Sequence, residues 1–232
     1  MIDYLKQILS REDRKRLHRK KWAIFHGNEP KVFGIGLNKT GTTSLTKAMS
    51  GLGYRVGDQY NALKDFESYQ KRDFKPIIKY CKTAQFFQDI PFSLPFTYVI
   101  LDHYFPNSKF ILTIRDNPEQ WYESLTSFHA KLWGKNNKTP VKKNLISAKY
   151  IRKGLPWDLI QEFFDTRDND PYEKETLINH YLNHNKQVKH YFQNRTEDLL
   201  VLNVSKKGAY RELCRFLNKP VNAEEFPWEN KT

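Results

Sequence analysis

The stretch KVFGIGLNKTGTTSL, residues 31–45, has the residue types of a phosphate-binding loop in an unusual order. The common nucleotide-binding loop follows the pattern G-x-x-x-x-G-K-[S/T], and Gly36 and Gly41 match its two glycines. The next position, where that loop has its lysine, is Thr42, and the lysine comes earlier, at Lys39. The stretch therefore predicts an anion site that differs from the usual triphosphate loop.

A strand, a glycine-bearing turn and a helix N-terminus bind anions because free backbone N–H groups and the helix dipole point at the ligand. Lys39 would add a full positive charge on the loop. The first helical turn would add the hydroxyl donors of Thr42, Thr43 and Ser44. No lysine follows Gly41 to reach a γ-phosphate, and the apolar run YVILD, ending at Asp102, is expected on a helix. We therefore expect a nucleotide 5′-phosphate that bears a transferable group and is held without a metal ion.

Short apolar runs alternate with helical patterns along the chain. Strands are expected at 31–37, 54–58, 84–90, 109–114 and 198–204, and helices at 3–24, 42–52, 60–81 with a break before Pro76, 95–105, 117–132, 171–194 and 208–218. This alternation predicts a three-layer α/β/α domain with a central parallel sheet, the architecture of P-loop proteins. Residues 133–153 are basic and weakly periodic, and they are expected to form a mobile loop.

Three chemically active residues each follow an expected strand directly: Lys39, Asp89 and Arg115. Ligands of parallel sheets bind beyond the carboxyl ends of the strands, so these residues should meet at one edge. Asp89 is the candidate general base, and positive charge nearby should lower its pKa. The alternative is that Asp89 caps a helix after Pro91. His103 and Asp58 are weaker candidates for the base.

Other distinctive residues are expected to be structural. The histidines His180, His184 and His190 should form a solvated helix face, although a pair spaced by four can bind metal in other contexts. Trp121 and Tyr122 should pack their helix, with contact to an adenine ring as the alternative.

Composition indicates one folded domain, residues 1–232, with a basic helix over 1–25 and a core over 31–227. Aromatic residues make up 15% of the chain, and the net charge is +13, so its partners should be anionic. Two cysteines without a Cys/His cluster favour neither a disulfide framework nor zinc. No apolar run approaches the ~20 residues that span a bilayer. We expect a soluble protein of a reducing compartment, the cytoplasm.

Two motifs together resemble a known family. GLNKTGTTSL is similar to the 5′-phosphosulfate-binding loop of sulfotransferases that use 3′-phosphoadenosine 5′-phosphosulfate (PAPS). KFILTIRDNPEQWYESL is similar to the 3′-phosphate-binding segment of that family, in which an arginine ends a strand and a serine lies in the following helix. The tail DLLVLNVSKKGAYRELCRFLNKPV resembles its last strand and helix, so the resemblance covers roughly residues 31–227.

The resemblance implies PAPS as donor, no metal, and a hydroxyl acceptor on a carbohydrate, a lipid or a small alcohol. It places Lys39 and Asp89 in catalysis. The residues that it implies for donor binding are Lys39, Thr40, Gly41, Thr42, Thr43, Ser44, Arg115 and Ser124. The Arg115-to-Ser124 spacing is one residue longer than in many members, which leaves Thr126 or Ser127 as alternatives to Ser124. The Arg-Lys-Gly of the cytosolic hormone and phenol enzymes has no counterpart near the C-terminus, so the chain resembles the compact bacterial and carbohydrate-type branches more closely.

Two other functions fit parts of the sequence. A small-molecule kinase with a degenerate loop would require ATP and magnesium. A non-enzymatic basic protein would bind polyanions or an acidic membrane through the N-terminal helix and residues 133–153. No nucleic-acid-binding motif is present in the sequence, so we expect no nucleic-acid partner.

Overall fold

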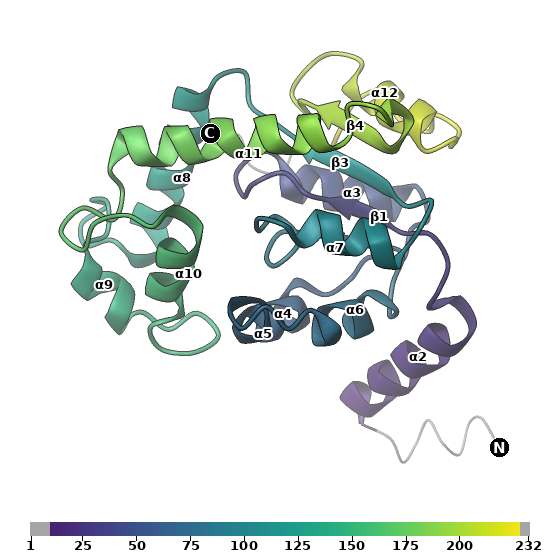
Figure 1. The fold of residues 1–232 in the computed structure, drawn as a ribbon, viewed down its shortest axis with the longest axis horizontal. Helices are drawn as coiled ribbons and strands as arrows, with labels where there is room; N and C mark the ends of the chain where they lie inside the picture. Colours follow the sequence, from purple (N-terminus) through teal and green to yellow (C-terminus); the bar gives the residue numbers. More distant parts are fainter. Residues whose placement is uncertain (1–9, 228–232) are drawn as a thin grey trace.

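The computed structural model describes residues 10–227, in which parallel strands alternate with helices (Figure 1). The strands are β1 (Val32–Gly34), β2 (Phe86–Gln88), β3 (Lys109–Thr113) and β4 (Leu199–Leu202). The helices are α2 (Arg11–His26), α3 (Thr42–Gly51), α4 (Gln59–Ala62), α5 (Phe66–Gln70), α6 (Lys75–Cys81), α7 (Thr97–Tyr104), α8 (Pro118–Trp133), α9 (Lys142–Ser147), α10 (Leu155–Phe164), α11 (Lys174–Tyr191) and α12 (Ala209–Phe216), with 3₁₀ turns η1 (Leu63–Asp65) and η2 (Thr196–Asp198). Residues 3–9 of the helix expected at 3–24 lie outside the described residues.

The four strands form one parallel sheet in the order β2-β1-β3-β4, which confirms the predicted α/β architecture. β1 lies inside the sheet, with Phe33 in register with Phe87 on one side and Phe110 on the other. The strand expected at 54–58 is wrong. Val56 makes only an isolated bridge to Phe86, because the chain turns at Gly57 into α4, whose N-cap is Asp58.

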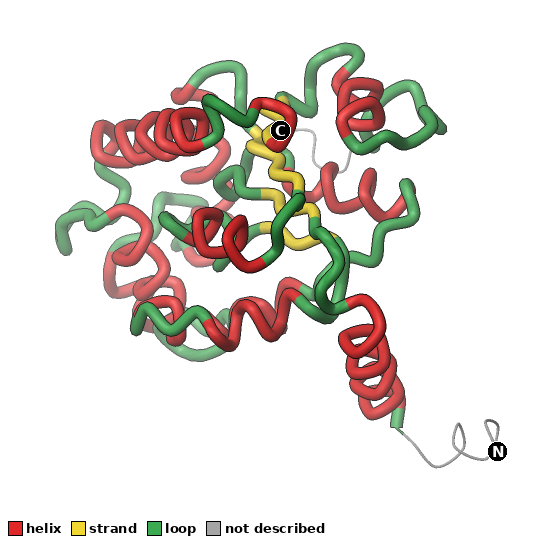
Figure 2. The backbone as a smooth tube through the Cα atoms, turned by 45° about the vertical axis from the view of Figure 1, so that its right-hand side comes forward, coloured by secondary structure: helices red, strands yellow, loops and turns green. Residues whose placement is uncertain are grey.

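Alternating strand residues cover the two faces of the sheet with separate apolar clusters. On one face Val32, Phe86 and Ile111 pack with buried residues of α3 and α12. On the opposite face Phe33, Phe87 and Phe110 pack with α4 to α8, α10 and α11. Figure 2 shows the strands enclosed between helices on both sides. This two-sided burial explains why the strands are short, continuous apolar runs.

Helices α8, α9 and α10 form a lobe on the side of the sheet from which the loop of Lys39 emerges (Figure 1, left). The sequence did not predict α10, although Leu155, Leu159, Ile160 and Phe163 recur at helical spacing and all are buried. The expectation of a loop over 133–153 is wrong in the central part of this segment, because α9 forms there and buries Leu145.

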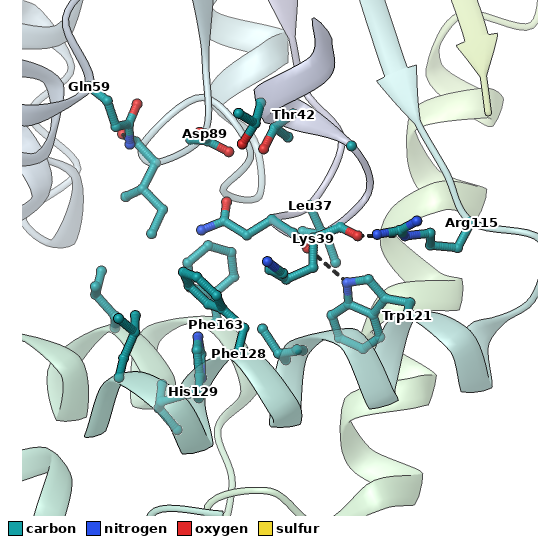
Figure 3. A pocket seen from close by; sticks show the side chains of 18 of the residues that line it. Leu37, Lys39, Thr42, Gln59, Asp89, Arg115, Trp121, Phe128, His129 and Phe163 are labelled. Carbon is teal, nitrogen blue, oxygen red and sulfur yellow. Dashed lines mark hydrogen bonds between the residues drawn. The ribbon is translucent and has the colours of Figure 1, made fainter. Parts of the chain in front are cut away.

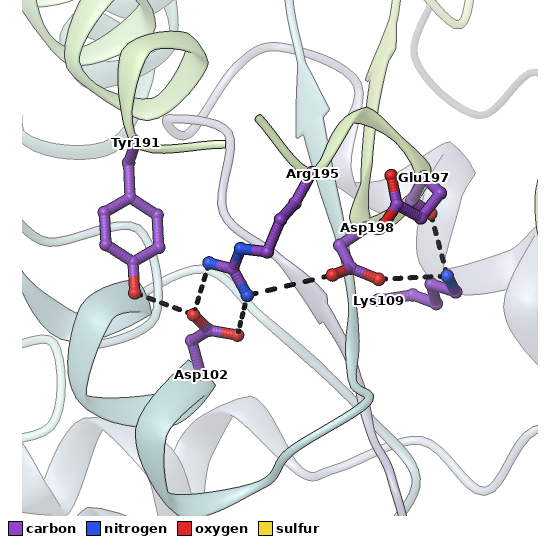
Figure 4. Close-up of polar contacts among 6 residues, drawn as sticks. All are labelled: Asp102, Lys109, Tyr191, Arg195, Glu197 and Asp198. Atoms are coloured by element: carbon purple, nitrogen blue, oxygen red, sulfur yellow. Dashed lines mark hydrogen bonds and ion pairs between the residues drawn. The ribbon is translucent and has the colours of Figure 1, made fainter. Parts of the chain in front are cut away.

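An ionic network joins the helices at the amino-terminal side of the sheet (Figure 4). Asp102, on α7, accepts two hydrogen bonds from Arg195 at 3.2 and 2.7 Å and one from Tyr191 at 2.7 Å. Burial alone would raise the pKa of Asp102, but the bonds from Arg195 and Tyr191 outweigh it and hold the pKa below its usual value. Asp198 continues the network to Lys109, with 3.1 Å between carboxylate and ammonium. Asp102 therefore lies on a helix, as expected, and its carboxylate is engaged in a structural ion pair.

Two further expectations concern the whole domain. Within residues 10–227 no helix has the length and apolarity required to cross a bilayer. Cys81 and Cys214 are both buried and are not joined in a disulfide.

Gly36 and Gly51 provide a paired test of the close contact between the β1 loop and β3. A Cβ atom on Gly36 would lie 2.2 to 2.6 Å from Oγ1, O and N of Thr113, whereas a Cβ on Gly51 has open space. Gly36→Ala should therefore lower the free energy of unfolding by about 1–3 kcal/mol. Gly51→Ala, at the end of α3, should raise it by about 0.5–1 kcal/mol through helix propensity. Urea denaturation measures both, and a neutral Gly36→Ala would contradict the close contact.

Candidate functional site

The loop between β1 and α3 is held by hydrogen bonds to its backbone carbonyl groups. His184 Nε2 donates to the oxygen of Ile35 at 2.8 Å, and Trp121 Nε1 donates to that of Asn38 at 3.0 Å. Arg115 Nε donates to the oxygen of Lys39 at 2.7 Å. The Thr40 hydroxyl donates to the oxygen of Leu37 at 2.6 Å. Donors from β3's end, α8 and α11 thus hold the carbonyl side of the loop.

The amino end of α3 is left open for a ligand. Its N-cap, Gly41, has φ +100° and has no side chain that could cap the first N–H groups of the helix. A Cβ atom on Gly41 would lie 2.3 Å from Cγ2 of Val204, so only glycine fits between the loop and the segment after β4. The predicted helix start at Thr42 is confirmed.

The loop faces a cavity of about 340 Å³ (Figure 3). The structure brings Lys39, Asp89 and Arg115 together at its wall, at the carboxyl edge of the sheet. The predicted donor-binding residues Gly41, Thr42, Thr43 and Ser44 also line it. The remaining wall comes mainly from apolar residues of α8 and α10.

Lys39 lies at the centre of this cavity wall. Its backbone adopts φ +72°, and its Nζ is 3.7 Å from the centre of the Phe128 ring, within cation–π range. Burial lowers the pKa of Lys39, and the charge of Arg115 lowers it further, while Asp89 acts in the opposite direction. The ammonium is thus held in place on an aromatic surface rather than extended into solvent.

Asp89 differs from the sequence expectation in its pKa. Burial raises the pKa of this carboxyl to about 6 and outweighs a hydrogen bond from Thr42, the charge of Lys39 and a hydrogen bond from Gln88. The expected lowering by positive charge is therefore wrong, because desolvation is the larger effect. Its Oδ1 is shielded from solvent and has no hydrogen-bond partner among the described residues. The alternative of a helix cap is also wrong, since residues 89–96 form turns and the next helix begins at Thr97.

Arg115 has a structural contact in addition to its place in the cavity. Its Nε is bonded to the loop, and its backbone N–H donates to the Tyr181 hydroxyl at 3.0 Å. Ser124, its expected partner, is buried on α8 and does not line the cavity, and its Oγ has no hydrogen-bond partner within residues 10–227. The alternatives also lie off the cavity wall, where Thr126 donates to the Tyr122 carbonyl and Ser127 is exposed.

Thr40 belongs to the loop, and its side chain contacts β3 and does not line the cavity. It is fully buried, and its hydroxyl shares a hydrogen bond of 2.5 Å with Thr113 in addition to the bond with Leu37. Its contribution to the site is therefore to hold the loop against β3.

The sequence analysis missed several polar residues of the cavity, among them His129 and Tyr150. His129, on α8, points toward the cavity (Figure 3), and its Nδ1 is 2.9 Å from the Tyr172 hydroxyl. Burial, followed by the charge of Lys39, lowers the pKa of His129 to about 3, so the ring is neutral at physiological pH. Tyr150 reaches the cavity from the segment expected to be mobile. The spacing of Trp121, Leu125 and Phe128 on one face of α8 was the signal that could have placed His129 there.

The expected solvated histidine face is wrong for two of its three members. His184 is buried and bonded to the loop, and burial lowers its pKa to about 4. His180 is half-buried against the rings of Phe163 and Phe164, and burial also lowers its pKa to about 4. Only His190 is exposed.

The remaining candidates have structural positions. Trp121 is 1% exposed and stacks on Tyr181 with 4.8 Å between ring centres, as expected for a packing residue. His103 is exposed on α7, and Asp58 caps α4. Neither lines the cavity. In the described part of the chain, no group of three or more His, Cys, Asp and Glu side chains is arranged to hold a metal ion.

The open N-terminus of α3, Lys39 on the preceding loop and the carboxyl of Asp89 thus lie together at one edge of the sheet. The chain belongs to the sulfotransferase domain family, which matches residues 31–232. A search of curated proteins finds no significant match. The class of reaction is therefore sulfuryl transfer.

The burial of Asp89 predicts a pH-dependent stability. Because the folded pKa of about 6 lies above the ordinary value of 3.8 for an aspartate, ionisation of Asp89 destabilises the fold as the pH rises from about 4 to 6. Asp89→Asn removes this ionisation. The free energy of unfolding of the variant relative to that of the wild type should therefore increase as the pH rises over that range, by at most about 3 kcal/mol.

Urea denaturation at several pH values between 4 and 8 measures this difference. Asp58→Asn is the control, because asparagine caps a helix as well as aspartate at this exposed position. A stability difference for Asp89→Asn that does not change with pH would contradict the burial argument.

Proposed function

We propose that the protein transfers a sulfuryl group from PAPS to an acceptor hydroxyl. The observation that supports this most directly is the uncapped N-terminus of α3 beside Lys39, with Arg115 separate from it at the same cavity. PAPS has two anionic ends, a 5′-phosphosulfate and a ribose 3′-phosphate. Two separated cationic sites match these two groups.

The residues present fit the 5′ end of this donor. Free N–H groups at the start of α3 and the hydroxyls of Thr42, Thr43 and Ser44 would hold the phosphosulfate. Arg115 uses Nε for the loop carbonyl, which leaves its terminal nitrogens for the 3′-phosphate. Ser205, after β4, also lines the cavity, whereas Ser124 is turned into the core.

PAPS supplies an activated sulfuryl group whose departure leaves negative charge on the 5′-phosphate. Lys39 would stabilise this charge, and its fixed position over Phe128 avoids reorganisation during the reaction. Asp89 would accept the proton of the acceptor hydroxyl. A pKa near 6 suits this role, because the carboxyl is ionised at neutral pH and is more basic than an exposed aspartate.

The kinase alternative has little support in the geometry. Asp102, on α7, is bonded to Arg195 and does not lie near the loop. Thr42 occupies the position of the usual lysine. Stabilisation by ATP with magnesium would favour the kinase alternative.

Membrane contact through α2 stays a prediction. It is supported by Ile24 and Phe25, which are 77% and 76% exposed and lie near Lys20 and Lys21. The cytoplasmic location also stays a prediction.

Binding of adenosine 3′,5′-bisphosphate tests the donor. This nucleotide should raise Tm more than AMP at equal concentration, because only it presents a 3′-phosphate to Arg115. Thermal shift measures both, with ATP and magnesium as a third arm. Arg115→Lys should weaken bisphosphate binding by about tenfold, since lysine cannot make the bidentate contact. Equal shifts for bisphosphate and AMP would contradict the assignment of Arg115.

Lys39 should contribute to turnover much more than to folding. Lys39→Ala should lower kcat by ~10²-fold or more if the ammonium stabilises charge in the transition state. Lys189→Ala, at an exposed position of α11, is the matched control and should keep wild-type turnover. A folded Lys39→Ala protein with unchanged kcat would show that the loop only positions the donor.

Substitution of Asp89 separates basicity from shape. In the wild type, kcat/KM should rise with pH and level off above an apparent pKa near 6. Asp89→Asn preserves the shape but removes the proton acceptor, so turnover should fall by ~10²-fold or more and this rise should disappear. Bisphosphate binding, followed by calorimetry, should persist. Normal turnover in Asp89→Asn would exclude Asp89 as the base.

A further inference from the structure

The cavity divides into a polar part and an apolar part on either side of Lys39. The carbonyl of Lys39 is bonded to Arg115, whereas its side chain lies on the ring of Phe128. In Figure 3 Arg115 is on one side of Lys39, and Phe128, His129 and Phe163 are on the other. A donor held at α3 and Arg115 occupies the polar part, so the acceptor must occupy the apolar part.

Two helices build this apolar part, which we call the acceptor chamber. It is lined by Leu125, Phe128 and Leu132 of α8 and by Leu159, Ile160 and Phe163 of α10. On each helix these residues are three or four positions apart, or adjacent to such a position, so they form one continuous face. Trp133 and Tyr150 close the chamber, with 6.1 Å between their ring centres in an edge-to-face arrangement.

The polar groups of the chamber are those near Lys39, His129 on α8 and the hydroxyl of Tyr150. Gln59 and Asp89 lie beside each other at the reactive end, where Gln59 Nε2 donates to the carbonyl of Ile90 at 3.0 Å. Among the described residues of α8 and α10 that line the cavity, the only polar side chain apart from the indole N–H groups is that of His129. Its nitrogen Nδ1 is already paired with Tyr172.

This distribution matches one class of acceptor. A sugar carries hydroxyl groups around its ring, and most of them would lose their hydrogen bonds to water on entering the chamber without finding partners. An acidic sugar would in addition place a charge among leucine and phenylalanine side chains. A molecule with an extended apolar body and a single terminal hydroxyl would bring only that hydroxyl to be paired, and the reactive end offers partners for it.

We infer that the acceptor is an apolar alcohol or phenol whose body fills the α8–α10 chamber and whose hydroxyl lies between Lys39 and Asp89. This inference rests on the proposed function. In the reaction the acceptor oxygen forms a bond to sulfur, the bond between sulfur and the 5′-phosphate oxygen breaks, and the hydroxyl proton passes to the Asp89 carboxylate. The products are a sulfate monoester and adenosine 3′,5′-bisphosphate.

A series of straight-chain primary alcohols from ethanol to octanol tests the chamber while the reacting group stays constant. With PAPS as donor, kcat/KM should rise by about fourfold for each added methylene until the chamber is filled. D-Glucose and D-glucuronate, which have more hydroxyls but no apolar body, should react no faster than ethanol. Binding gives a second measure, because octanol should raise Tm of the bisphosphate-bound protein and D-glucose should not.

Two leucines with nearly equal exposure provide matched variants. Leu132, 49% exposed, lines the chamber, whereas Leu182, 46% exposed, lies on α11 outside it. Leu132→Gln should reduce the gain per methylene and the Tm shift by octanol. Leu182→Gln should leave both unchanged. Neither position is in the core, so both proteins should fold and bind the bisphosphate.

The outcomes separate the two levels of the argument. If bisphosphate fails to bind and PAPS supports no transfer, the proposed function is wrong and the inference about the acceptor is overturned with it. If bisphosphate binds but kcat/KM is independent of chain length, or D-glucose reacts faster than octanol, the donor assignment stands and the apolar acceptor is overturned. An equal loss of chain-length dependence in both leucine variants would also overturn the location of the chamber.

Discussion

The loop between β1 and α3 depends on donors that bind its backbone carbonyls from distant parts of the chain. Arg115, at the end of β3, Trp121, on α8, and His184, on α11, each hold one carbonyl, and Thr40 holds a fourth from within the loop. With its carbonyl side fixed, the loop presents the uncapped end of α3 to the cavity. The proposed anion site therefore requires that the sheet and both helices have assembled, which would couple folding to function.

The same packing sets the electrostatics of the site. Burial raises the pKa of Asp89 and lowers the pKa values of Lys39 and His129. Charges in such an environment interact more strongly than in water. Under the proposed function, the apolar surface that receives the acceptor would also make the carboxylate more basic and the fixed ammonium more effective. Acceptor choice and catalysis would then be two consequences of one arrangement of side chains.

Sequence patterns predicted the parts of the structure that depend on local chemistry. Thr42 begins a helix after a glycine turn, and the apolar runs after Lys31 and Ser108 form neighbouring parallel strands, so the meeting of the Lys39 loop with Arg115 followed from chain order. The family resemblance on these two motifs is confirmed by the match over residues 31–232. The donor-binding and catalytic roles of individual residues stay predictions.

Properties that depend on burial were not predictable in this way. Burial, which depends on the folded chain, has the largest effect on the pKa of Asp89, and the positive charge visible in the sequence has a smaller effect. His184 fits a solvated helix pattern but is turned into the core by the packing of α11 on the loop. The helix α10 is short and follows directly after the basic segment 133–153, and its apolar face became clear only beside α8.

A crystal structure with adenosine 3′,5′-bisphosphate tests the central claim most directly, namely that the fixed loop and the open end of α3 form the donor site. The account predicts that oxygens of the 5′-phosphate lie within hydrogen-bond distance of the N–H groups of residues 41–44, with the 3′-phosphate at Arg115. It also predicts that the carbonyl contacts of Arg115, Trp121 and His184 stay unchanged, because the site is already formed. A nucleotide bound with its 5′-phosphate away from α3, or a loop that rebuilds these contacts on binding, would contradict it.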